Sequence, residues 1–222
     1  MNRPAGVLFD FDGVIVDSLA VHLRAWENAS QRIYGTAVAE PRRLAGRSTE
    51  AIAKIIAAEN REPGSASTLA EAKRDELRSL ATGMPSLPGV PEVFDYLRSE
   101  GIPFGIASNA PRAFVSRTLE QLHLDVQIRI GIEDVRHGKP SPEPFLTCAK
   151  QLGIAVMDHP RVLVFEDSTH GLRAAVGAGM IAIGVTTQHE SSDLIAAGAR
   201  ATCAHLRDAL DRGWFGSLKY FA

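Results

Sequence analysis

The chain has 222 residues with a formal net charge of −2, and 45% of its residues are hydrophobic while 23% are charged. This composition is typical of a globular protein with one large domain, or with one domain and an insertion. It gives no indication of a nucleic-acid or membrane-surface partner. The longest apolar stretch, 174–185, is broken by three glycines and is too short to span a bilayer.

The two cysteines, Cys148 and Cys203, cannot form a disulfide framework and lack the spacing of a metal-binding motif. The sequence reaches its first apolar strand almost at once, which leaves no room for a signal peptide. We therefore expect a cytoplasmic protein with reduced thiols. The sequence predicts a small-molecule partner, as argued below, and no protein, nucleic-acid or membrane partner.

The first apolar segment, Val7-Leu8-Phe9, predicts a buried strand. Two acidic residues, Asp10 and Asp12, follow it, and Gly13 ends the strand. In an open parallel sheet the reactive site lies beyond the carboxyl ends of the strands, so both acids could face one metal ion and one substrate. The pair alone also fits a turn in which the acids cap a loop or hold a structural cation.

The next part of the chain predicts only helices. Helical periodicity covers residues 19–33, 42–61 with a break at Gly46, and 69–81. A polar stretch around Pro63 and Gly64 predicts a loop. Because no strand pattern occurs before Pro88, we expect an all-helical block inserted after the first strand.

From there, strands and helices alternate. Strands are predicted at 103–107, 126–132, 162–165 and 181–185, and helices at 90–101, 111–122, 143–152, 171–177, 192–197 and 205–210. This alternation indicates a parallel, doubly wound sheet. The predicted fold class is α/β, with a Rossmann-like core of residues 1–17 and 86–222 and an inserted all-helical cap of residues 18–85.

Reactive side chains follow several of these predicted strands. They are Asp10 and Asp12, Ser108, Lys139 in a further loop, and Glu166 with Asp167. Carboxylates are hard oxygen ligands that suit Mg²⁺, which commonly takes one or two of them together with water and substrate phosphate. The lysine and the ion would offset the charge of a phosphoryl group, and the serine would donate a hydrogen bond to it. One carboxylate could attack phosphorus while the other handles the proton of the leaving oxygen.

Four segments resemble the motifs of the haloacid dehalogenase superfamily of phosphotransferases, in the same order along the chain. They are 10–18 (DFDGVIVDS), 108–109 (SN), 138–145 (GKPSPEPF), and 165–172 (FEDSTHGL) with 174–175 and 178–180. The helical block lies where the subfamily with a small helical cap carries its insert. This resemblance covers nearly the whole chain and implies Mg²⁺ as the cofactor.

By the same resemblance, Asp10 is the nucleophile that becomes an aspartyl phosphate. Asp12 is the general acid for the leaving group and then the base for the attacking water. The metal ligands are the side chains of Asp10 and Asp167 and the backbone carbonyl of Asp12, with Glu166 close by. The second acid implies a phosphatase or mutase, because a dehalogenase has no alkoxide leaving group that needs a proton.

The insert carries the residues that the resemblance links to the substrate. His22 matches a cap histidine of beta-phosphoglucomutase, and Lys73 matches a lysine that faces the active site in that mutase and in sugar phosphatases. The 44–49 loop resembles their substrate loop. The mutase has an arginine after the serine of this loop, whereas this chain has Thr49 there and Arg47 nearby. In the mutase this arginine binds the second phosphate of a bisphosphate intermediate. Its absence here favours a phosphatase over a mutase.

We therefore predict a Mg²⁺-dependent phosphatase for a small phosphorylated metabolite, a sugar phosphate by resemblance. A beta-phosphoglucomutase-like mutase and a non-catalytic binding protein are the alternatives. The predicted catalytic residues are Asp10, Asp12 and Lys139, the substrate or phosphate contacts are Ser108, Asn109, His22, Arg47 and Lys73, and the metal ligands are Asp10, Asp12, Asp167 and Glu166.

Structural roles compete with some of these assignments. Ser108 and Asn109 could cap the following helix. Glu166 could orient Lys139 instead of binding metal. The three insert residues could be packed or solvated side chains, as is common for charged residues.

Overall fold

The structure is a computed structural model that describes residues 3–39, 44, 49–80 and 83–221. The chain forms two compact units. The sheet unit comprises Met1–Asp17 and Pro85–Ala222, and the helical unit comprises Ser18–Met84. Each unit has its own hydrophobic core, so each is described separately.

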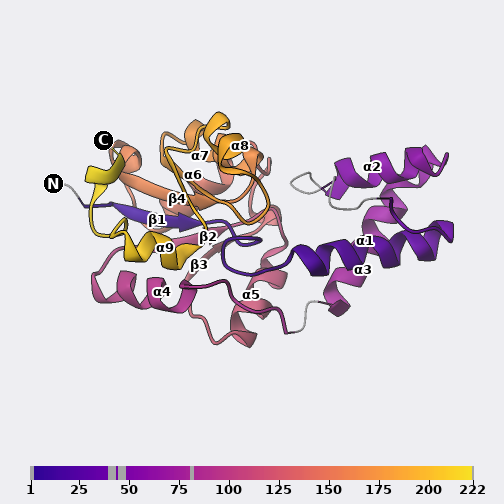
Figure 1. Ribbon diagram of the computed structural model, residues 1–222, viewed down its shortest axis with the longest axis horizontal. Helices are drawn as coiled ribbons and strands as arrows, with labels where there is room; N and C mark the ends of the chain where they lie inside the picture. The colour runs from indigo at the N-terminus through magenta and orange to yellow at the C-terminus, as the bar shows by residue number, and fades with distance from the viewer. Residues whose placement is uncertain (1–2, 40–43, 45–48, 81–82, 222) are drawn as a thin grey trace. The chain divides into compact units, whose positions relative to one another are not determined.

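Six parallel strands form the sheet, in the order β3-β2-β1-β4-β5-β6 (Figure 1). Their bounds are β1 Gly6–Phe9, β2 Phe104–Ala107, β3 Ile128–Ile130, β4 Val162–Glu166, β5 Ile181–Val185 and β6 Ala201–Cys203. β1 lies between β2 and β4, and Phe9 is paired with Ile106 on one side and Phe165 on the other. The strand that carries Asp10 at its end is therefore central.

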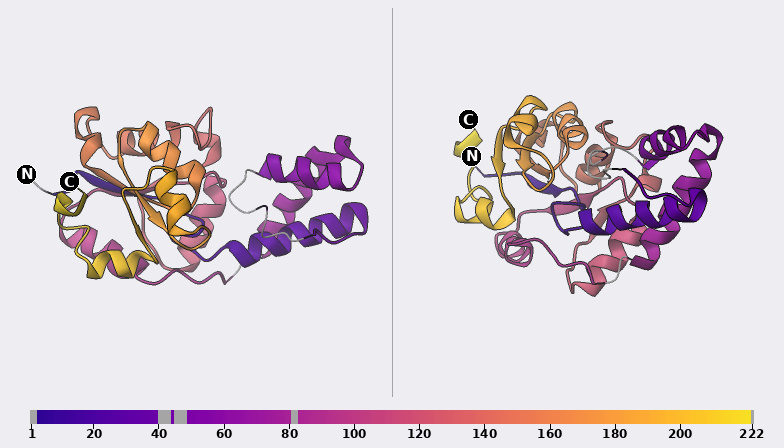
Figure 2. Two further views of the ribbon diagram at one scale, coloured as in Figure 1. Left: turned by 45° about the horizontal axis from the view of Figure 1, so that its top comes forward. Right: turned by 45° about the vertical axis from the view of Figure 1, so that its right-hand side comes forward.

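Helices cover both faces of the sheet (Figures 1 and 2). One layer contains α4 Val90–Ser99, α5 Arg112–Gln121 and α9 Leu206–Asp211, and the other contains α6 Glu143–Gln151, α7 Thr169–Gly177 and α8 Ser191–Ala196. Short 3-10 helices lie at η3 Ile132–Asp134, η4 Val156–Arg161 and η5 Leu218–Phe221. Because strand side chains alternate, Val7 and Phe9 pack in the first core and Leu8 in the second. Because β1 is buried on both faces, its sequence is a continuous apolar run instead of an alternating pattern.

The helical unit consists of α1 Leu19–Tyr34, α2 Thr49–Glu59, the 3-10 helix η2 Pro63–Ser65 and α3 Ala66–Leu80 (Figure 2). α3 packs against both α1 and α2. Trp26, Ile56 and Leu69 lie in their shared core. Gly35 ends α1 in the left-handed conformation, with φ of 67°.

The predicted fold class, a doubly wound parallel sheet with an inserted helical block, is confirmed. Several element predictions were wrong in detail. β6 was missed, because a strand of three residues is too short to show a period. β3 is shorter than its predicted range, and α3 begins at Ala66 where a loop was predicted. The predicted helix over 42–61 is described only at Leu44 and from Thr49 onward; its other residues lie outside the described ranges.

None of the helices in the described ranges is both long enough and apolar enough to cross a membrane.

Candidate active site

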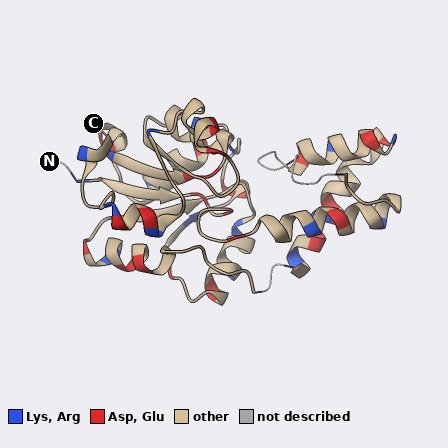
Figure 3. Cartoon of the chain, viewed as in Figure 1, with Lys and Arg blue, Asp and Glu red and all other residues tan. Residues whose placement is uncertain are grey.

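Few charged side chains in the described part of the chain are buried. Blue and red segments are interspersed along the helices of both units (Figure 3). The buried Asp, Glu, Lys and Arg residues among those described are Asp10, Lys73, Lys139, Glu166 and Asp167. All but Lys73 belong to one group at the carboxyl ends of β1 and β4. Because burying a charge is costly, this group marks a candidate site.

The carboxylates of this group come from two neighbouring strands. Asp10 follows β1, Glu166 ends β4 and Asp167 comes next. The strands are paired up to Phe9 and Phe165, and the Asp10 backbone N–H donates to the Phe165 carbonyl at 2.9 Å. Oxygen atoms of the three carboxylates lie within 4.8 Å of one another. We call Asp10, Glu166 and Asp167 the carboxylate cluster.

Lys139 provides the positive charge in this group. Its Nζ donates to Asp10 Oδ1 and, at 2.8 Å, to Glu166 Oε1. The ammonium also lies 4.6 Å from the centroid of the Phe145 ring. Burial lowers the pKa of Lys139, but the charges of Asp10 and Glu166 outweigh burial and raise the pKa above its ordinary value. Lys139 is therefore a fixed cation at the edge of the sheet.

One ammonium does not offset the charge of the cluster. Burial raises the pKa of Asp10 from 3.8 to about 7; Lys139 opposes this, while Glu166 and Asp12 add to it. Burial, followed by repulsion from Glu166 and Asp10, raises the pKa of Asp167 well above its ordinary value. Closely spaced oxygen donors with excess negative charge fit a hard divalent cation such as Mg²⁺.

Glu166 is held by hydrogen bonds to both of its oxygens. Oε1 accepts from Lys139, while Oε2 accepts from the backbone N–H of Ser168 at 2.7 Å and from its hydroxyl at 2.9 Å. Ser168 is also the N-cap of α7, accepting from the Gly171 N–H at 3.0 Å. A Cβ at Gly171 would overlap the Glu166 carboxylate, so the glycine leaves the room that this carboxylate occupies.

The segment after β2 brings Asn109 against the backbone of Lys139. Its Oδ1 accepts from the Lys139 backbone N–H at 2.9 Å, and its Nδ2 donates to the Lys139 carbonyl at 3.3 Å. Ser108 is buried, and its hydroxyl accepts from the Ala110 N–H at 3.0 Å. The N-cap of α5 is Pro111, so neither residue is the cap itself. The Asn109 side chain thus fixes the backbone that carries Lys139.

Asp12 is half-buried in a tight turn after β1. The Gly13 N–H donates to the Val16 carbonyl at 2.8 Å. Gly13 has φ of 78°, and a Cβ there would overlap the Asp167 carboxylate. Only glycine adopts this conformation easily and also leaves room for the carboxylate.

The segment after β5 also reaches the site, and the sequence did not predict this. Gln188 Nε2 donates to Asp167 Oδ2 at 2.7 Å, and His189 Nδ1 lies 2.9 Å from the Asp167 carbonyl. The Thr187 hydroxyl donates to the Gly13 carbonyl at 2.7 Å and lies 3.3 Å from Asp167 Oδ2. The sequence feature that could have indicated this contact is the run of polar residues, 186–189, after the strand predicted at 181–185.

The helical unit brings two of its three predicted substrate residues together. Lys73 Nζ lies 3.0 Å from His22 Nδ1 and 5.6 Å from the centroid of the Trp26 ring. Lys73 is buried. Arg47, the third predicted residue, lies outside the described residues.

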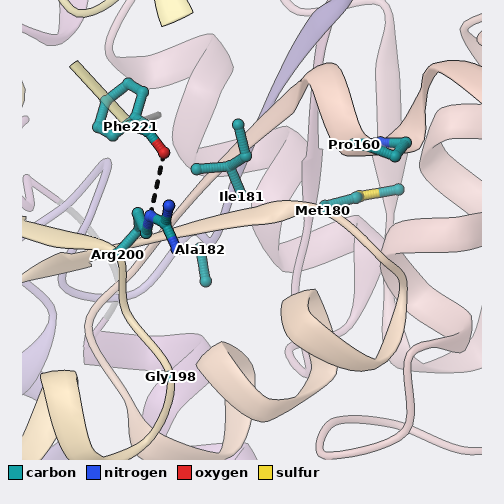
Figure 4. Close-up of a pocket in the computed structure, with 7 residues that line it drawn as sticks. All are labelled: Pro160, Met180, Ile181, Ala182, Gly198, Arg200 and Phe221. Carbon is teal, nitrogen blue, oxygen red and sulfur yellow. Dashed lines mark hydrogen bonds between the residues drawn. The ribbon is translucent and has the colours of Figure 1, made fainter. Parts of the chain in front are cut away.

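A separate pocket of about 320 Å³ lies at the other end of the sheet (Figure 4). Its lining includes Pro160, before β4, and Ile181, the first residue of β5. Arg200 Nε donates to the Phe221 carbonyl at 3.0 Å beside it. Because the carboxylate cluster lies at the carboxyl ends of the strands, this pocket does not belong to the candidate site.

Comparisons with known proteins agree with the motifs. The family model of the haloacid dehalogenase-like hydrolases matches residues 4–179. A fructose-1-phosphate phosphatase of Escherichia coli is 31% identical over 189 residues, which cover 83% of this chain and 97% of that protein. A validoxylamine A 7'-phosphate phosphatase of Streptomyces hygroscopicus is 29% identical over 202 residues, covering 84% and 88%. A hydrolase from Pseudomonas syringae has a similar structure, with a TM-score of 0.81 at 25% identity, covering 96% and 99%.

Proposed function

Because the chain belongs to the haloacid dehalogenase-like hydrolase family and is thus an enzyme of the hydrolase class, we propose that it is a Mg²⁺-dependent phosphatase. The observation that carries this proposal is the buried pairing of Lys139 with Asp10 and Glu166, beside Asp167. We propose a small phosphorylated metabolite of the sugar-phosphate class as substrate. The name of the fructose-1-phosphate phosphatase supports that class.

In the proposed reaction, a carboxylate oxygen of Asp10 attacks phosphorus, and the bond from phosphorus to the substrate oxygen breaks. Asp12 gives its proton to the leaving oxygen, so the dephosphorylated product departs neutral at that atom. Asp12 then takes a proton from water, the water oxygen attacks the phosphorus of the aspartyl phosphate, and inorganic phosphate leaves. Asp10 is regenerated as a carboxylate and Asp12 as an acid.

Lys139 and its neighbours prepare the site for this attack. Lys139 holds Asp10 by one oxygen and offsets negative charge on the phosphoryl group. Since both oxygens of Glu166 accept protein hydrogen bonds, we assign Glu166 to orienting Lys139. Asn109 fixes the Lys139 backbone. We assign the Ser108 hydroxyl to a phosphoryl oxygen, because its proton is not used in the bond that it accepts from Ala110.

Asp10, Asp167 and the backbone carbonyl of Asp12 are the proposed ligands of the divalent cation. The raised pKa values of Asp10 and Asp167 support this choice, because burial and, after it, repulsion between the acids disfavour their charged forms, which a bound cation stabilises. When bound, the cation supplies further charge stabilisation for the phosphoryl oxygens.

We propose that the sheet core of residues 1–17 and 86–222 performs the chemistry and that the helical block of residues 18–85 acts as a substrate-selecting cap. The contact between Lys73 and His22 supports a shared role for these two residues in substrate binding. Arg47 is proposed for the same role from the sequence.

The test is phosphate release from a panel of sugar phosphates, with Mg²⁺ and with a chelator. We expect activity only with Mg²⁺ and none from Asp10→Asn. With labelled acetyl phosphate as donor, whose leaving group needs no proton, an Asp12→Ala variant should retain radiolabelled phosphate on the protein in a form that hydroxylamine removes, because hydrolysis of the acyl phosphate lacks its base. Activity that survives chelation, or a fully active Asp10→Asn enzyme, would overturn the mechanism. Tight ligand retention without turnover on a broad panel would favour a binding protein.

The mutase alternative is separated by its products. Incubation with beta-glucose 1-phosphate and a bisphosphate primer yields glucose 6-phosphate without free phosphate only from a mutase. We expect free phosphate, because Thr49 stands where the mutase has its clamping arginine. Formation of glucose 6-phosphate without free phosphate would replace the phosphatase by the mutase.

A further inference from the structure

Three consecutive side chains after β5 all contact Asp167 or the turn beside it. Gln188 Nε2 donates to Asp167 Oδ2 at 2.7 Å. His189 Nδ1 lies 2.9 Å from the Asp167 carbonyl, and because a carbonyl only accepts, this histidine nitrogen carries the proton. Thr187 connects the same segment to Gly13. The 187–189 segment therefore packs on Asp167 from a neighbouring strand.

Gln188 is the main side-chain donor to the Asp167 carboxylate. The Thr187 hydroxyl has one proton, and its shorter bond, 2.7 Å, goes to the Gly13 carbonyl instead of Asp167 Oδ2 at 3.3 Å. Oδ2 also lies where a Gly13 Cβ would be, so this oxygen is fixed between the Gly13 backbone and the Gln188 amide. No donor among the described residues reaches the second oxygen, Oδ1.

The type of donor matters for the charge of the cluster. On the other side of the cluster, Lys139 binds Asp10 and Glu166 with a full positive charge. On the Asp167 side the donor is a neutral amide, which orients the carboxylate without cancelling its charge. The negative charge that remains on Asp167 is available to a cation.

We propose that Gln188 is a positioning residue that holds Asp167 for a divalent cation, with Oδ2 bound by the protein and Oδ1 left for the ion. This rests on the proposed function, which makes Asp167 a metal ligand. Partners that orient a metal ligand typically change metal affinity by about 10–100-fold when they are removed.

The experiment measures Mn²⁺ binding directly, from the electron paramagnetic resonance signal of unbound Mn²⁺. The variants are Gln188→Met, which keeps the side-chain length without the amide, and Gln188→Lys, which adds a positive charge beside Asp167. Thr186→Val is the matched control, because Thr186 directly precedes the 187–189 segment but its hydroxyl donates to the Cys203 carbonyl at 3.3 Å. Unfolding midpoints without metal show whether each variant is folded.

We expect Gln188→Met to weaken Mn²⁺ binding about tenfold, Gln188→Lys to weaken it further, and Thr186→Val to bind like the wild type. The Mg²⁺ concentration needed for half-maximal phosphatase activity should rise in parallel, while turnover at saturating Mg²⁺ changes less. A loss below about fivefold in Gln188→Met overturns the positioning role. A wild type that binds no Mn²⁺ overturns the metal site of the proposed function, and the positioning role with it; the wild-type measurement therefore separates the two failures.

Discussion

Replacing Lys139 by Met removes the cation of the candidate site and little else. Methionine keeps an unbranched apolar side chain that can still pack on the Phe145 ring, but it cannot pair with Asp10 or Glu166. The side chains of the three paired residues are only 4% (Lys139), 9% (Asp10) and 1% (Glu166) exposed. Water therefore cannot take over the lost interactions.

This burial determines the expected magnitude. An exposed ion pair contributes about 0–1 kcal/mol to stability. Removing one partner of a buried pair costs about 3–5 kcal/mol, because the other charge remains buried without compensation. Here two carboxylates, Asp10 and Glu166, lose their shared cation. We expect Lys139→Met to lower the unfolding free energy of the metal-free protein by about 3–5 kcal/mol at alkaline pH, with a smaller loss toward neutral pH, because Asp10 without its lysine takes up a proton more readily.

The two tryptophans allow this loss to be assigned to the sheet unit. Trp214 packs in the core of the sheet unit, and Trp26 lies in the core of the helical unit. In a Trp26→Phe background, urea unfolding followed by fluorescence reports on the sheet unit alone. Arg207→Met is the matched control, because the side chains of its ion pair with Glu92 are 38% and 48% exposed. We expect that control to change stability by about 1 kcal/mol or less.

A loss below about 1 kcal/mol in Lys139→Met would refute the reasoning, because it would equal that of an exposed pair. If Lys139→Met does not fold, the double variant Lys139→Met/Glu166→Gln provides the answer. It removes one of the two uncompensated charges while preserving shape, so it should recover part of the stability. A double variant as unstable as the single one would contradict the electrostatic explanation.

The remaining predictions concern the residues around this lysine. The raised pKa of Asp10 means that folded protein keeps a proton that the unfolded chain releases, so the metal-free unfolding free energy should fall as pH rises from about 4 to about 7. Asp10→Asn should reduce this slope in urea titrations; an unchanged slope would contradict the assignment. Gly171→Ala should displace the Glu166 carboxylate and lower kcat about tenfold or more, whereas Gly177→Ala in the same helix meets no atom closer than 3.6 Å and should keep full activity. Equal kcat values for the two variants would rule this out. Asn109→Ala should lose two hydrogen bonds, each worth about 0.5–1.5 kcal/mol, and lower both kcat and the unfolding midpoint; a wild-type kcat would show that the Lys139 backbone does not need them.

The strands at the centre of the sheet were predictable because they are buried on both faces. Continuous apolar runs mark β1 and β4, and the acids after them mark the rim of the sheet. The edge strand β6 was not predictable, since Ala201-Thr202-Cys203 shows neither an apolar run nor alternation. It forms because β5 offers it unpaired backbone groups, which is a tertiary effect.

The site likewise contains residues that the sequence pattern predicts and residues that only tertiary contacts bring into place. The family motifs led to Asp10, Lys139, Glu166 and Asp167, and the structure brings these four together. The role of Gln188 depends on the adjacency of β4 and β5, because it contacts a residue 21 positions earlier in the chain. A glutamine after a strand carries no pattern that names its partner.

The charge of each hydrogen-bond donor in the site is related to the carboxylate that it binds. The three carboxylates of the cluster have one ammonium, that of Lys139, beside them, and Asp12 adds a fourth acid at the rim. A second buried lysine could have balanced the charge, but it would have left nothing to attract a cation and would have bound Asp167 as tightly as Lys139 binds Asp10. Instead, the neutral amide of Gln188 orients Asp167 and leaves its charge in place. Burial, together with the repulsion among these carboxylates, raises the pKa values of Asp10 and Asp167. In the proposed function, this uncompensated charge attracts the divalent cation and, with it, the anionic phosphoryl group.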